Sequence, residues 1–241
     1  MRSRGLVIFD AFNTLVTSRR GSKRTFLAGL AQAGLNSSRA MLRELQAASE
    51  GLDHSGWSGS RSAYCGWATE TLAAVAQTGG DLPVSLAPHV VPALEQRHQA
   101  AMVALPGAAD CLTELRRAGF TIAVCSNWGW DLASDIATAG LAASIDVFVT
   151  SAQAGYRKPH PRIYHDTLER AGFSAQDAVF IGDSLRTDVL GPQRISIPSV
   201  LVAAPATCQT GYEQVASLAE VPGLVLGTSP PARPSTSCNR L

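Results

Sequence analysis

The sequence predicts an α/β fold, a Rossmann-like doubly wound parallel sheet with an inserted all-helical cap domain. Short apolar runs recur along the chain and alternate with segments of helical spacing. This alternation stops between about residues 16 and 105, where only helical patterns are evident. Alternating strands and helices are typical of a parallel sheet with helices on both faces, and a long interruption is typical of an inserted second domain.

Five short apolar runs are predicted as buried parallel strands. Each is apolar on both faces and rich in β-branched side chains, as expected for strands covered by helices. In chain order they are residues 6–10, 121–125, 145–149, 178–182 and 199–202.

Helical spacing fills the segments between these strands. The expected core helices are residues 108–118, 131–139, 161–171 and 184–194, and those of the cap are 23–33, 38–50, 60–77 and 86–103. Gly119 and Gly172 directly follow two of the core helices, which is a helix-stop signal. The predicted domains are a core of residues 1–15 and 106–228, a helical cap of 16–105, and a flexible tail of 229–241.

Composition limits the classes of partner. The chain has 241 residues, 46% of them hydrophobic, and a formal net charge of +1. This hydrophobic content excludes a wholly disordered chain, and the near-neutral charge argues against bulk nucleic-acid binding. No apolar run reaches the roughly 18 residues of a membrane-spanning helix, so we expect neither a nucleic-acid nor a membrane partner. The sequence leaves the oligomeric state open.

Cysteine usage and the N-terminal residues favour a cytoplasmic protein. The five cysteines are scattered, odd in number and never spaced CxxC, which argues against a disulfide framework or a zinc ribbon. The apolar run before Asp10 is too short for a secretory leader.

Polar residues that follow the strands form the candidate site. Ligands of doubly wound sheets bind beyond the carboxyl ends of the strands. The candidates are Asp10, Ser126, Asn127 and Asp183, together with Asp188 and with Lys158 in a loop that opens a helix. Each alone has a plainer explanation, since an aspartate after a strand is often a helix N-cap. Together they offer carboxylates for Mg²⁺, a lysine and a hydroxyl for an anion, and a carboxylate nucleophile.

Short motifs occur in a fixed order around these residues. They are Asp10-Ala-Phe-Asn-Thr14, Ser126-Asn127, Arg157-Lys-Pro-His-Pro-Arg-Ile-Tyr164 and Ile181-Gly-Asp-Ser-Leu-Arg-Thr-Asp188. With them the sequence resembles the haloacid dehalogenase-like (HAD) hydrolase superfamily, in the subfamily with a helical cap after the first strand. The resemblance covers about residues 6–202, including the position of the cap.

The resemblance implies a role for each matching residue. Asp10 matches the aspartate nucleophile, Thr14 the threonine four residues on, and Ser126 the hydroxyl of the second motif. Lys158 matches the lysine of the third motif. Asn127, which follows Ser126 in the second motif, is expected to be a catalytic residue as well. Mg²⁺ is the implied cofactor and a small anionic molecule the implied substrate. The implied metal ligands are Asp10, the Phe12 backbone carbonyl, Asp183 and Asp188.

Position 12 departs from the phosphatase pattern. Phosphatases of this superfamily carry a second aspartate there, which protonates the leaving group and then activates water, whereas this chain has Phe12. General acid–base help is worth about 10²–10⁴-fold. The loss of this acid matters greatly for an alkyl phosphate, because an alkoxide leaves badly without a proton. It matters little when the leaving group is a halide or when the substrate is an acyl or enol phosphate. Otherwise Asn13 or a cap residue would have to supply the missing acid.

Three functions therefore remain open from the sequence. Gly182-Asp183 and Lys158 favour a Mg²⁺-dependent hydrolase of a small phosphorylated metabolite. Phe12 resembles the bulky aromatic residue of the metal-free 2-haloacid dehalogenases, although the fourth motif lacks their Ser-Ser-Asn pattern. The third possibility is a catalytically degraded relative that only binds a ligand or a partner. Trp128 is expected either to line the pocket or to pack against the cap.

Overall fold

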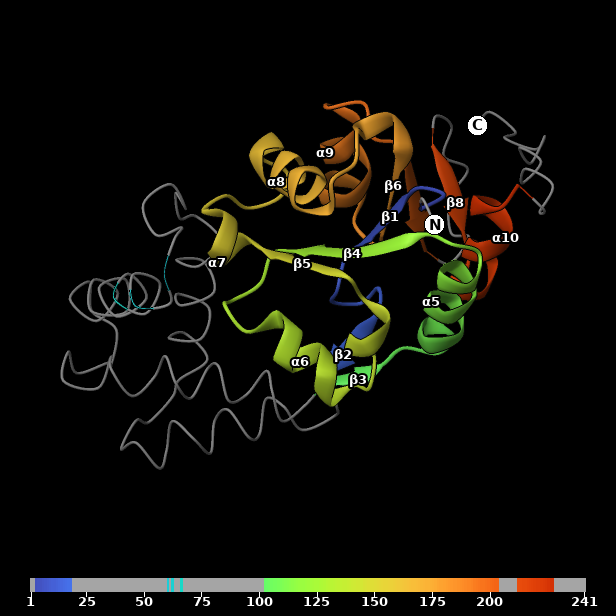
Figure 1. Ribbon diagram of the computed structural model, residues 1–241, viewed down its shortest axis with the longest axis horizontal. Coiled ribbons are helices and arrows are strands. Elements are labelled where there is room, and N and C mark those ends of the chain that lie inside the picture. Colours follow the sequence, from blue (N-terminus) through green and yellow to red (C-terminus); the bar gives the residue numbers. More distant parts are fainter. Residues whose placement is uncertain are drawn as a thin grey trace, which may run out of the picture.

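Six parallel strands form the central sheet of the protein (Figure 1). The computed structural model describes residues 3–18, 60, 62, 66, 102–203 and 212–227. The strands, in spatial order, are β5 (Val147–Thr150), β4 (Thr121–Ser126), β1 (Leu6–Phe9), β6 (Ala178–Gly182), β7 (Ser199–Val202) and β8 (Glu213–Val215). All five pairings between neighbours are parallel, so the five predicted strands and the doubly wound fold are confirmed.

Strand β8 is an edge strand that the sequence did not predict. It has three residues, of which only Val215 is buried. A strand this short and this polar has no alternation long enough to be recognised in the sequence.

Helices cover both faces of the sheet (Figure 1). The described α-helices of the core are α5 (Ala108–Arg117), α6 (Leu132–Thr138), α7 (Ser151–Ala154), α8 (Pro161–Ala171), α9 (Leu190–Gln193) and α10 (Val221–Val225). Alternate residues of β1 point to opposite faces: Val7 and Phe9 pack with α5 and α6, whereas Leu6 and Ile8 pack with α8. Burial on both faces explains why β1 is a continuous apolar run.

Helix α8 shows how local sequence sets the ends of a helix. Pro161 stands in the first turn, where its missing N–H costs no hydrogen bond, and Gly172 takes a left-handed φ of 74° at the C-cap. The predicted bounds 161–171 are those observed. The predicted helix 184–194 instead begins as a π-helical turn, Leu185–Val189, and continues as α9.

The first and last residues of the expected cap segment form a small second sheet, which the sequence did not predict. Strand β2 (Val16–Ser18) pairs antiparallel with β3 (Met102–Ala104). The expectation that residues 16–105 contain no strand is therefore wrong at both ends, and the helix expected over 86–103 cannot extend to its predicted end. These three-residue strands are stabilised by pairing between distant parts of the chain, which no local pattern reports.

Most of the predicted cap and the whole predicted tail, residues 229–241, lie outside the described residues, so both remain predictions. Within the described part of the chain, no helix has the length and apolar character needed to cross a bilayer.

Candidate active site

The candidate residues meet at the carboxyl ends of the central strands. Asp10 directly follows β1, and its backbone N–H donates to the carbonyl of Ile181 in neighbouring β6 at 2.9 Å. Ser126 is the last residue of β4, on the other side of β1. This edge of the sheet is where ligands of doubly wound folds bind.

Lys158 lies between two carboxylates. Its Nζ donates to Asp10 Oδ1 at 2.6 Å and to Asp188 Oδ1 at 2.7 Å. The hydroxyl of Ser126 also donates to Asp10 Oδ1, at 3.0 Å. No described residue hydrogen-bonds the second oxygen of Asp10, Oδ2, so one oxygen of this carboxylate is held in place while the other is available.

Burial and charge oppose each other in this cluster. The pKa of Asp10 is raised from 3.8 to about 6: burial is the largest cause and raises it, the Lys158 charge opposes this, and the Asp188 charge adds to it. For Lys158, burial lowers the pKa, but the charges of Asp10 and Asp188 outweigh burial and leave it above its ordinary value. The lysine is therefore a permanent cation, and Asp10 beside it is mainly anionic at neutral pH.

Asn127 positions the backbone of Lys158. Its Nδ2 donates to the Lys158 carbonyl at 3.0 Å, and its Oδ1 accepts from the Lys158 N–H at 2.7 Å. The donor and the acceptor of the Asn127 amide therefore both hydrogen-bond the backbone of Lys158. The sequence placed Asn127 among the catalytic residues, and the structure shows a side chain that holds the lysine loop.

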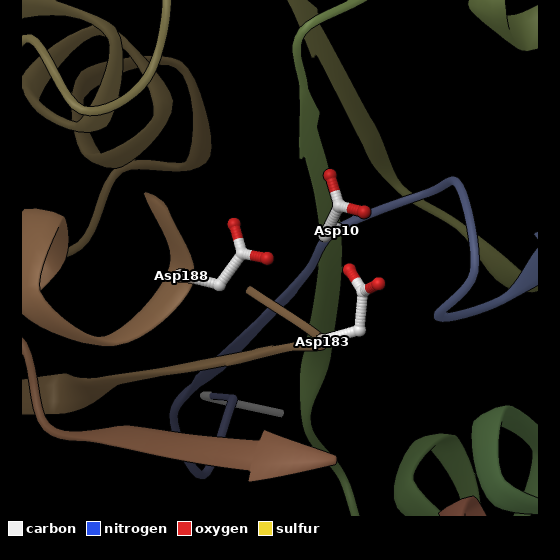
Figure 2. Close-up of side chains that lie close together, drawn as sticks. All are labelled: Asp10, Asp183 and Asp188. Carbon is white, nitrogen blue, oxygen red and sulfur yellow. The ribbon is translucent and has the colours of Figure 1, made fainter. Parts of the chain in front are cut away.

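Three carboxylates converge beside the lysine. Asp10, Asp183 and Asp188 each offer an oxygen, and these oxygens lie within 4.8 Å of one another. Figure 2 shows the three carboxyl groups gathered at one place, brought from the end of β1, the end of β6 and the π-helical turn. Burial raises the pKa of Asp183, and the charge of Asp188 raises it further. One ammonium cannot neutralise three carboxylates, so the cluster fits a divalent cation with oxygen ligands.

A close approach of the chain to itself brings Asp188 to the cluster. A Cβ on Gly182 would lie 2.5 Å from Cβ, Cγ and Oδ2 of Asp188, well inside contact distance. The Ser184 N–H donates to Asp188 Oδ2 at 3.0 Å, and the buried Tyr164 donates its hydroxyl to the Thr187 carbonyl at 2.6 Å. These contacts are not evident in the sequence, although the glycine before Asp183 is a visible signal.

Replacing Gly182 by alanine should therefore displace Asp188 and weaken metal-dependent turnover by at least about tenfold, since misplacing a site group by about 1 Å costs about 10²-fold. Turnover and the Mg²⁺ concentration at half-maximal activity would be measured together. Gly66→Ala is the control, because a Cβ there meets nothing within 4 Å and Gly66 does not have the left-handed φ that would strain an alanine. Equal activity of both variants would show that the close approach is dispensable.

The loop after Asp10 contributes Phe12, Asn13 and Thr14. Asn13 has a left-handed φ of 60°, which asparagine tolerates better than most residues, and its side chain acts to lower the pKa of Asp183. Among the hydrogen bonds of the described residues, none uses the Phe12 carbonyl. Thr14 Oγ1 is buried and has no partner among the described residues, so the role expected for Thr14 remains a prediction.

Comparison with known proteins agrees with this geometry. The family model for haloacid dehalogenase-like hydrolases matches residues 5–195. Human haloacid dehalogenase-like hydrolase domain-containing protein 3 is 35% identical over 108 residues, 45% of this chain and 43% of that protein. Phosphoglycolate phosphatase of Agrobacterium fabrum is 30% identical over 122 residues, 50% of this chain and 49% of that protein. These matches span about half, or less, of the length of either relative.

A solved structure shares the fold. The 2-haloacid dehalogenase from Pseudomonas syringae pv. Tomato superimposes with a TM-score of 0.71 at 18% identity, over 93% of this chain and 99% of that one. The family match includes β1 with Asp10, the Lys158 loop, and β6 with Asp183 and Asp188. This chain belongs to the haloacid dehalogenase-like hydrolases.

Proposed function

We propose that this chain is a Mg²⁺-dependent hydrolase that removes the phosphoryl group from a small anionic metabolite. The observation that carries the proposal is the cluster of three carboxylates around one buried ammonium. Such a cluster has an excess of negative charge that a divalent cation would neutralise. A curated relative that is a phosphoglycolate phosphatase supports the same chemistry.

The metal would be held by Asp10, Asp183 and Asp188 together with the backbone carbonyl of Phe12. These are oxygen donors, which Mg²⁺ prefers, and hydrolases of this family generally use a divalent metal. When bound, the metal would neutralise negative charge on the phosphoryl oxygens. The remaining roles belong to the side chains of this chain.

Asp10 would act as the nucleophile. Its free oxygen attacks phosphorus, the bond from phosphorus to the leaving oxygen breaks, and the electron pair stays with the leaving group. Water then attacks the phosphorus of the aspartyl phosphate, which releases phosphate and restores the Asp10 carboxylate. Lys158 and Ser126 both donate hydrogen bonds to Asp10 Oδ1 and so would orient the nucleophile. The same two groups would offer the phosphoryl oxygens a positive charge and a hydrogen-bond donor.

The proposal is tested by phosphate release from a mixed panel of phosphomonoesters and acyl phosphates, with Mg²⁺ and with EDTA. We expect EDTA to abolish release, and Asp183→Asn to lower it by at least about 10²-fold, since one charged metal ligand is lost. Asp177→Asn, the same change just before β6, should behave as wild type. Release that survives both EDTA and Asp183→Asn would contradict the metal-dependent mechanism.

Metal binding should strengthen as pH rises. The pKa of Asp10 in the metal-free protein is raised to about 6, so below that pH protons compete with the metal for its carboxylate. A group with that pKa is about one-tenth ionised at about pH 5, and we expect Mg²⁺ to bind about tenfold more weakly there than at about pH 7.5. Calorimetric titration at the two pH values measures this. Equal affinity would mean that Asp10 is not a ligand.

Hydrolytic dehalogenation of a 2-haloacid is the second candidate. The aromatic side chain of Phe12, 39% exposed two residues after Asp10, favours it, because a halide leaves without a proton. In this reaction Asp10 would displace halide from carbon and water would hydrolyse the ester. Halide release from short 2-haloacids that is insensitive to EDTA would favour this candidate over the phosphohydrolase. Ligand-induced stabilisation without any turnover would instead indicate a binding protein.

A further inference from the structure

An aromatic pair lies beside the proposed nucleophile. Phe12 comes two residues after Asp10 at the end of β1. Trp128 comes two residues after Ser126 at the end of neighbouring β4. The ring centroids of Phe12 and Trp128 are 6.2 Å apart and their planes are inclined by 52°. The Ser126 hydroxyl donates a hydrogen bond to Asp10. Both aromatic residues therefore follow the carboxyl ends of β1 and β4, where the reacting carboxylate also lies.

The two rings are held differently. Trp128 is 9% exposed, and its Nε1 donates to buried Asp135 at 2.7 Å. Its backbone carbonyl accepts from the Ser151 hydroxyl at 3.1 Å. Phe12 rests against this anchored ring and remains 39% exposed. The result is an apolar surface, supported by an anchored ring, two residues along the chain from Asp10; an apolar surface at the same strand ends as a charged cluster can bind a ligand with one charged end and one apolar end.

Neither Lys158 nor Ser126 is suited to protonate a departing oxygen. Asp10 and Asp188 hold Lys158 as a cation, and the Ser126 hydroxyl is a weak acid that already donates to Asp10. Phe12 has no acidic proton. An alkoxide that leaves unprotonated forgoes the roughly 10²–10⁴-fold that general acid catalysis supplies. A carboxylate or a phenolate is a stable anion and leaves without that help.

We propose that the site selects phosphates whose leaving group is a stable anion with a flat apolar body that rests on Phe12, namely aromatic acyl phosphates and aryl phosphates. This inference rests on the phosphohydrolase function proposed above. Asp10 attacks phosphorus, the bond to the leaving oxygen breaks, and the pair of electrons stays on a carboxylate or phenolate oxygen. Water then hydrolyses the aspartyl phosphate; its oxygen goes to phosphate and its proton to phosphate or solvent.

Leaving-group dependence tests this specificity. The substrates are benzoyl phosphate, acetyl phosphate, nitrophenyl phosphate, phenyl phosphate and glycerol phosphate, with Mg²⁺ and with Asp10→Asn as the background. We expect kcat/KM for benzoyl phosphate to exceed that for glycerol phosphate by at least about 10²-fold, the lower end of what an acid would supply. We also expect KM to be lower for benzoyl phosphate than for acetyl phosphate.

Variants of Phe12 separate the two parts of the proposal. Phe12→Asp supplies an acid and should raise the rate for glycerol phosphate relative to acetyl phosphate by at least about tenfold. Phe12→Asn introduces a side chain of the size of aspartate that carries no acid, so it should not raise this rate ratio. Phe12→Leu should reduce the preference for benzoyl over acetyl phosphate but keep the preference of both over glycerol phosphate. Phe173→Leu, in the apolar cluster packed around α8, is the remote control for loss of a ring.

The outcomes distinguish this inference from the function on which it rests. Asp10-dependent release that is equally fast from glycerol phosphate and benzoyl phosphate overturns the specificity and leaves the phosphohydrolase intact. A Phe12→Asp variant with the same ratio of rates as Phe12→Asn overturns the missing-acid argument. If no substrate in the panel gives Asp10-dependent phosphate, the proposed function fails and the specificity fails with it.

Discussion

Replacing Asp10 by asparagine should lower phosphate release by at least about 10³-fold, the scale seen when a covalent nucleophile is removed. The amide of asparagine is a poor nucleophile, and its lost charge also leaves Lys158 with one carboxylate partner instead of two. Steady-state phosphate release with Mg²⁺ measures the loss. Acid quenching during turnover should trap a hydroxylamine-sensitive phosphoryl group on wild-type protein and none on the variant.

Asp166→Asn is the matched control for this change. Asp166 lies on α8, where it is partly exposed and pairs with Arg170 at 2.9 Å. The variant should keep wild-type turnover and phosphoryl labelling. If Asp10→Asn also keeps them, Asp10 is not the nucleophile, provided that its thermal unfolding shows a folded protein.

Replacing Lys158 by methionine should destabilise the metal-free protein by about 3–5 kcal/mol, as expected when one partner of a buried ion pair is removed. Methionine fills similar space but carries no charge. Asp10 and Asp188 would then remain buried without a counter-charge, and both lose a hydrogen bond. Urea unfolding in EDTA measures the free energy of unfolding. The same variant should also lose turnover, because Asp10 would no longer be oriented.

Arg116→Met is the control for the effect of burial. Arg116 pairs with Asp146 at 2.7 Å, the same distance as Lys158 to Asp188, but its side chain is 38% exposed and that of Lys158 is 1% exposed. Breaking an exposed pair costs about 0–1 kcal/mol. Equal destabilisation by the two substitutions would contradict the view that the Lys158 cluster is stabilised by buried charge pairing.

Mg²⁺ should offset part of the Lys158→Met penalty. A divalent cation at the three carboxylates would supply some of the positive charge that the lysine provided. Ligand that binds only the folded state stabilises it by mass action. The increase in unfolding temperature with Mg²⁺ would therefore be compared between wild type and the variant, and it reports on metal binding without any need for turnover.

Parts of the fold were predictable because they are local in sequence. The five apolar runs that became β1, β4, β5, β6 and β7 were visible since parallel strands covered on both faces are apolar throughout. Helix α8 was predicted to the residue because Pro161 and Gly172 mark its ends. Strand β8 and the β2–β3 pair were missed, because three-residue strands have too little periodicity to be recognised.

The candidate site divides in the same way. The residues of its charged cluster follow strands or open helices, so their positions in the chain predicted that they would share one edge of the sheet. Their contacts were not visible. Nothing in the local pattern indicates that Lys158 bridges Asp10 and Asp188, or that Gly182 leaves the space that Asp188 occupies.

The sequence by itself determined the order of the five apolar strands and of the longer core helices between them, the residue types at the strand ends and the absence of an acid at position 12. Only the tertiary structure decided which of these groups are buried, which oxygen of Asp10 is held and which ring supports Phe12. The physical reason is range. Periodicity and capping act between residues a few positions apart, whereas burial and charge pairing depend on segments that meet only after the sheet has formed.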